Sequence, residues 1–105
     1  MGRKIPVFGS REHQETLEYF GFTIGSRGAS RHVKATPPSN IKIKPGQIAF
    51  IMVQLGVKEF YDPRFRSQLV REITSFGFPE EEVIMALRGE FKRLKKLSKS
   101  RGKKD

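Results

Sequence analysis

The longest uninterrupted apolar segment of the chain runs from Ile48 to Val53 and is only six residues long. A membrane-spanning helix needs roughly 20 apolar residues, so we expect a small globular fold without membrane contact. Periodicity cannot separate strand from helix where every residue is apolar. The Ile, Phe and Val content favours a central strand over residues 47–55, and a short buried helix is the alternative.

The pattern of this apolar segment also indicates how it is covered. A strand that is buried on one face only alternates apolar and polar residues. Residues 48–53 do not alternate, so we expect the second face of the strand to be buried as well. The terminal helix is the expected cover, and another chain is the alternative.

The residues before this strand predict one helix and two strands. Ser10 is suited to cap a helix that ends at Gly21. Residues 22–24 and 30–36 have the pattern of two strands joined by a glycine-containing turn, with alternating side chains in the second. Residues 41–44 also alternate, which leaves an edge strand or an extended basic loop as alternatives.

Two further helices are predicted after the apolar strand. Asp62 followed by Pro63 is a strong helix start, because aspartate caps the helix and proline suits its first turn. This helix is expected to end at Gly77, and its apolar stripe consists of Phe65, Leu69, Ile73 and Phe76. One more helix is expected after Pro79, with an apolar stripe of Val83, Leu87, Phe91 and Leu94.

This order predicts a single two-layer α+β domain over residues 1–97, with a helix–three strands–helix core and an added C-terminal helix. Residues 98–105 are expected to form a basic, disordered tail. The chain contains no cysteine, which excludes disulfides and thiolate metal sites. Its first residues lack the long apolar core of a signal peptide, so we expect a cytoplasmic protein.

The positive charge of the chain has two sources. The net charge is +10, and residues 88–105 hold nine Lys and Arg against two acids, so much of this charge belongs to the tail. The second source is more informative, because no acidic residue lies between Tyr19 and Lys58. A basic surface without carboxylates suits phosphate groups. The residues predicted to face nucleic acid there are Arg27, Ser30, Arg31, His32, Lys34, Lys42 and Lys44.

Several short motifs stand at the boundaries of the expected elements. They are Lys4-Ile5-Pro6-Val7 before the first helix, Gly21-Phe22 after it, Arg27-Gly28-Ala29-Ser30 at the strand turn, and either Gly46-Gln47-Ile48 or the segment from Ser67 to Val83. Together they resemble the HicA-like family of small toxins from type II toxin–antitoxin systems. The resemblance covers roughly the first 80 residues. It implies a fold like that of double-stranded-RNA-binding domains, translation-independent ribonuclease activity, and a cognate antitoxin protein as partner.

The active histidine of that family stands at the start of the second strand, a position that Ser30 occupies here. His32 lies two residues further along and is expected on the same strand face. Imidazole changes its protonation near neutral pH and suits proton transfer at a ribose hydroxyl or a leaving oxygen. We therefore take His32 as the candidate catalytic residue of a metal-independent endoribonuclease, with phosphate binding or simple exposure as its alternative roles.

Two other functions also fit the sequence. One is a non-catalytic nucleic-acid-binding module that uses the helix over residues 62–76 or the basic tail. The other is an interaction subunit that forms a homodimer through residues 48–53. We favour RNA over DNA as partner, because duplex RNA is recognised through shape, phosphate and 2′-hydroxyl contacts. No cofactor or metal is expected, since no carboxylate lies close to His32 in the sequence.

Overall fold

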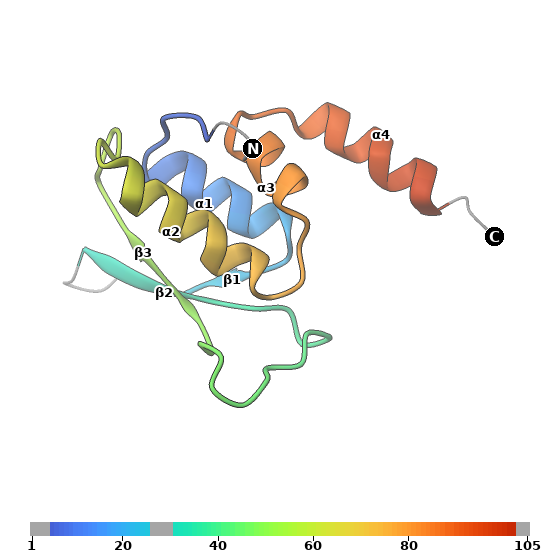
Figure 1. Ribbon diagram of the computed structural model, residues 1–105, viewed down its shortest axis with the longest axis horizontal. Coiled ribbons are helices and arrows are strands. Elements are labelled where there is room, and N and C mark those ends of the chain that lie inside the picture. Colours follow the sequence, from blue (N-terminus) through green and yellow to red (C-terminus); the bar gives the residue numbers. More distant parts are fainter. Residues whose placement is uncertain (1–4, 26–30, 103–105) are drawn as a thin grey trace.

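The computed structural model of the chain describes residues 5–25 and 31–102. Its elements, in order, are α1 (Ser10–Tyr19), β1 (Thr23–Ile24), β2 (His32–Thr36), β3 (Ile51–Gln54), α2 (Pro63–Thr74), α3 (Glu80–Leu87) and α4 (Phe91–Gly102). The three strands form one antiparallel sheet in the order β1-β2-β3. The predicted α+β class is therefore confirmed. The three strands of the sheet follow the first helix and precede the second in the chain, as predicted (Figure 1).

The two uncertain segments between β2 and α2 resolve as one strand and one loop. Residues 51–54 form β3, so the strand alternative for 47–55 is correct, although the strand is shorter than predicted. Residues 41–44 lie in the loop that joins β2 to β3 and form no edge strand. This loop projects away from the helices in Figure 1.

The core lies between the sheet and the helices on one side of it (Figure 1). Val33 and Ala35 of β2 lie opposite Val53 and Ile51 of β3, and none of the four is more than 4% exposed. They pack in one cluster with side chains from α1, α2 and α3. Burial of this apolar area is the main favourable term in folding such a small domain.

The second face of β3 is not buried, so the expectation that the terminal helix covers it is wrong. Ile48, Phe50 and Met52 are 37–44% exposed. Helix α4 packs instead on α3 and places Phe91 against the ring of Tyr19, with ring centroids 5.4 Å apart. β3 therefore alternates in burial even though its sequence does not alternate in polarity.

Helix α2 begins as its sequence predicts, but it ends at Thr74, before the predicted stop at Gly77, so Phe76 lies just beyond it. Asp62 is the N-cap, and its carboxylate accepts a hydrogen bond of 2.9 Å from the Arg64 N–H. Gly77 follows the helix with a φ of 105°, a conformation that glycine adopts at little cost. None of the described helices is both long and apolar enough to cross a membrane.

The single helix predicted after Pro79 is two helices. Helix α3 ends at Leu87, and Gly89 follows with a φ of 80°, which breaks the helical path. Helix α4 then keeps part of the predicted stripe, because Leu94 is only 2% exposed. It continues to residue 102 and so includes residues 98–102, which we expected to belong to a disordered tail.

The first helix is capped differently from the prediction. Gly9, and not Ser10, is the N-cap, and its N–H donates to the Glu12 carboxylate at 2.8 Å. The Ser10 hydroxyl donates to the Gln54 carbonyl oxygen and accepts a hydrogen bond of 2.9 Å from the Val57 N–H. The start of α1 is therefore bonded to the chain that leaves β3.

Candidate nucleic-acid interface

The outer face of β2 carries the central part of the predicted site. Val33 and Ala35 point into the core, whereas His32 and Lys34 are exposed on the opposite face, as the alternation predicts. Arg31 precedes the strand and is also exposed. His32 and Lys34 thus lie on the outer face of the sheet, where His32 also lines a hollow with Phe65 and Glu72 of α2.

The other predicted residues are placed less closely. Lys42 and Lys44 are exposed on the loop between β2 and β3. The Lys44 N–H donates to the side chain of Gln47 at 3.0 Å, and the Gln47 side chain donates to the Ser75 carbonyl oxygen at 2.7 Å. The loop is thereby attached to the end of α2. Arg27 and Ser30 lie outside the described residues.

An aromatic ring adjoins the basic strand, and sequence reasoning missed it. The Lys34 Nζ lies 4.6 Å from the centroid of the Phe50 ring, a cation–π contact. Lys34 pairs across the ladder with Met52, so basic and apolar side chains share this face. Exposed aromatic rings beside cations stack on bases in nucleic-acid-binding proteins. The candidate interface therefore consists of Arg31, His32, Lys34 and Phe50.

The two histidines of the chain are in opposite environments. His32 lies on the outer face of the sheet, where a substrate would meet it. His13 lies on α1 and is 1% exposed, and burial lowers its pKa to about 4. His13 therefore cannot serve as a second acid–base group for the interface. Any acid–base chemistry there would use His32 with the neighbouring cations.

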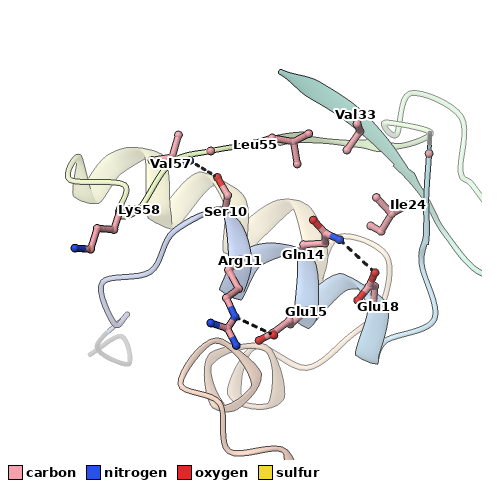
Figure 2. Close-up of a pocket in the computed structure, with 12 residues that line it drawn as sticks. Ser10, Arg11, Gln14, Glu15, Glu18, Ile24, Val33, Leu55, Val57 and Lys58 are labelled. Carbon is pink, nitrogen blue, oxygen red and sulfur yellow. Dashed lines mark hydrogen bonds and ion pairs between the residues drawn. The ribbon is translucent and has the colours of Figure 1, made fainter. Parts of the chain in front are cut away.

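A separate cavity of about 730 Å³ lies between α1 and the ends of the strands. Figure 2 shows its two walls, with the apolar Leu55 and Val57 on one side and polar residues of α1 on the other. In the polar wall, Arg11 forms an ion pair with Glu15 at 3.3 Å, and the Gln14 side-chain amide donates a hydrogen bond of 3.4 Å to the Glu18 carboxylate. Of the predicted interface residues that fall within the described ranges, none lines this cavity. Its carboxylates Glu15 and Glu18 offset the charges of Arg11 and Lys58, so the cavity lacks the excess of positive charge that suits phosphate.

Over the two described ranges, no cluster of three His, Cys, Asp or Glu side chains is arranged to hold a metal ion. Comparisons with protein-family models, with curated proteins and with solved structures find no match. A functional assignment for this chain therefore depends on the chemistry of its own surface and on the motifs of its sequence.

Proposed function

We propose that this protein is a HicA-like RNA-binding toxin that contacts RNA through the candidate interface and cleaves it with His32. The observation that carries the proposal is the orientation of β2, which exposes His32 and Lys34 on the outer face of the sheet. Lys42 and Lys44 extend the basic surface, and no acidic residue interrupts it between positions 20 and 57. Such a surface attracts the phosphate backbone.

The order of the elements supports RNA as the partner. Elements α1–β1–β2–β3–α2 follow the helix–three strands–helix order that the HicA-like resemblance implies for a fold like that of double-stranded-RNA-binding domains. Domains of that kind read duplex RNA by its shape and by its phosphates and 2′-hydroxyls. Double-stranded or hairpin RNA is therefore the proposed ligand.

The proposed chemistry requires no metal. The His32 imidazole would take the proton of a ribose 2′-hydroxyl, whose oxygen then attacks the adjacent phosphorus to give a 2′,3′-cyclic phosphate. The P–O5′ bond breaks, and the leaving 5′-oxygen takes a proton from water. Lys34 lies two residues along the same strand face and would neutralise the charge that develops on the phosphoryl oxygens.

Replacing His32 with alanine tests the catalytic part of the proposal. We expect wild-type protein to cleave total RNA in the presence of EDTA and His32→Ala to leave it intact, while RNA affinity in a mobility-shift assay is unchanged. Gln54→Ala is the matched control, because Gln54 faces His32 across the ladder, and it should cleave normally. Intact RNA in all lanes, with a retained mobility shift, would contradict the enzymatic function and leave a binding protein.

A non-catalytic RNA-binding module is the second candidate, and the burial of His13 favours it. Metal-free cleavage of RNA is most efficient when one group removes a proton and another supplies one. Because His13 is 1% exposed, only His32 can provide an imidazole at the surface. In this function the interface holds phosphate and bases without reacting with them.

The salt dependence of RNA affinity identifies the surface that binds phosphate, whether or not the protein cleaves RNA. Neutralising Lys34, Lys42 and Lys44 together with glutamine should reduce the slope of log affinity against log salt by about 2 to 3, because each phosphate contact contributes roughly 0.7 to 0.9. The matched control removes the same charge from α4, at Lys92, Lys95 and Lys96, and should leave the slope nearly unchanged. A larger loss in the α4 variant would place the phosphate contacts on α4 and contradict the proposed interface.

A further inference from the structure

A hollow of about 440 Å³ adjoins the candidate interface, between the exposed side chains of β3 and helix α2. Its lining includes His32 and Phe50 of the interface, and α2 contributes Phe65, Gln68 and Glu72 among others. A volume of this size lies within the range of about 300 to 1,000 Å³ that is usual for small-molecule sites. We call it the interface hollow, and it is large enough to hold one nucleobase.

The apolar side chains of the interface hollow have no role in phosphate binding. Ile48, Phe50 and Met52 line it and are 37–44% exposed. Exposed apolar patches of this kind mark surfaces that bind a ligand. Proteins that recognise unpaired RNA bases stack them on aromatic side chains. Phe50 before β3 and Phe65 of α2 each bring such a ring to the hollow.

The hollow also contains a carboxylate, which repels phosphate but suits the edge of a base. Glu72 is half-buried in the last turn of α2, where the helix dipole favours cations instead. The Gln68 side-chain amide donates to one Glu72 oxygen at 3.3 Å, and a carboxylate has further acceptor sites. Glu72 can therefore accept hydrogen bonds from the N–H groups of a base.

We infer that the interface hollow binds one unpaired guanine of a hairpin RNA. The Watson–Crick edge of guanine carries two adjacent donors, N1–H and N2–H, which match the two oxygens of a carboxylate. The second N–H of the Gln68 amide can donate to the guanine O6 oxygen. Adenine, cytosine and uracil each offer Glu72 only one donor on this edge, so they are held less firmly.

This inference deepens the proposed function and rests on it. A base in the hollow brings its own ribose beside His32, because His32 lines the same hollow. The Lys34 Nζ lies 4.6 Å from the centroid of the Phe50 ring, so the phosphate that follows this ribose would meet a cation. Paired bases cannot enter the hollow without leaving their stack. Cleavage is therefore expected on the 3′ side of an unpaired guanosine.

Affinity for a set of hairpin RNAs that differ in one loop base tests the inference. The hairpins share one stem and carry deoxyguanosine, deoxyinosine or deoxyadenosine at the same unpaired position, where the missing 2′-hydroxyl prevents cleavage. Wild-type protein should bind the guanine hairpin about tenfold more tightly than the adenine hairpin. The inosine hairpin should lie between them, because inosine lacks the N2 amino group and keeps N1–H.

The variant Glu72→Gln should reduce the preference for guanine over adenine to about threefold or less. Comparing the two hairpins within each protein cancels the general gain in RNA affinity that follows from removing a negative charge. The matched control is Glu80→Gln, which removes the same charge from an exposed residue of α3 outside the hollow and should keep the wild-type preference. A preference that survives Glu72→Gln unchanged would overturn the inference.

The outcomes separate the base site from RNA binding itself. Equal, tight binding of the three hairpins would overturn the base site and leave the RNA-binding surface in place. A wild-type protein that binds none of them would contradict the proposed function, and the base site with it.

The variant Phe50→Ala provides an independent check. It should weaken binding of the guanine hairpin about tenfold, because a stacking partner is lost, and should leave binding of a blunt duplex with the same stem nearly unchanged. An equal loss for hairpin and duplex would show that Phe50 does not stack on the unpaired base and would contradict the inference.

Discussion

Replacing Gly9 with alanine is expected to lower the free energy of unfolding by about 3 kcal/mol or more. A Cβ at this position would overlap the Lys58 carbonyl oxygen and would lie 2.6 Å from the Val57 carbonyl oxygen. Gly9 has a φ of −128°, which alanine adopts without strain. The loss would therefore come from the collision with the neighbouring backbone and not from the conformation of Gly9 itself.

The structure has little freedom to relieve this collision. The Ser10 N–H donates to the Val57 carbonyl oxygen at 2.8 Å, and the Phe60 N–H donates to the Phe8 carbonyl oxygen at 2.8 Å. These bonds hold the two backbone segments together on both sides of Gly9. Separating them by the distance that a methyl group needs would break hydrogen bonds of partly buried groups, each of which contributes about 1 kcal/mol.

Urea unfolding of Gly9→Ala beside Gly46→Ala separates crowding from backbone strain. Gly46 has a φ of 82°, and a Cβ added there would meet no atom within 4 Å, so alanine should cost only about 1 kcal/mol through strain. Gly9→Ala should lose at least twice as much. Equal losses in the two variants would mean that the segments around Gly9 move apart easily and that the close contact is not a constraint on the fold.

The parts of the fold that sequence reasoning predicted are those set by neighbouring residues. Asp62 and Pro63 start α2 because capping and the fixed φ of proline act within one turn. The alternation of residues 32–36 identifies both the strand and its exposed face, because strand side chains point to opposite sides in turn. The sequence alone is therefore enough to assign His32 and Lys34 to one surface.

The parts that were missed depend on distant contacts. No residue near Gly9 in the sequence indicates that Gly9 contacts Lys58. Whether the terminal helix packs on β3 depends on where the chain turns at Gly89. The continuous apolar sequence of β3 conceals that Phe50 and Met52 are exposed, so their place beside Lys34 becomes visible only with the strand register. The burial of each side chain in this strand is decided by its neighbours in space and not by its own polarity.

The other missed feature is the burial of His13. Its ring lies near those of Phe8 and Phe60, with centroid distances of 6.2 and 6.5 Å. Neither ring nitrogen has a hydrogen-bond partner within the described part of the chain. Histidine is a polar residue, so its place in the core is not visible in the pattern of apolar residues on α1. In the structure the neutral imidazole takes the place of an apolar side chain.

We expect this buried histidine to make the protein markedly less stable in mild acid. Burial lowers the His13 pKa from 6.5 to about 4, so in that range the unfolded chain binds a proton that the folded chain does not. The contribution of the neutral, buried His13 to the free energy of unfolding is complete above pH 6.5. It decreases as the pH falls and is lost at about pH 4. A pKa difference of this size corresponds to a loss of about 3 kcal/mol over the whole range.

Comparing wild type with His13→Leu by urea unfolding at several pH values between about 7 and 4 isolates this effect. Leucine cannot be protonated and fills a similar volume, so His13→Leu should lose about 3 kcal/mol less than wild type over this range. Every other ionisable group is the same in the two proteins, so its contribution cancels in the difference. Parallel curves for wild type and His13→Leu would show that the folded protein accommodates a charged His13, and the core around α1 would then be more open to water than its packing indicates.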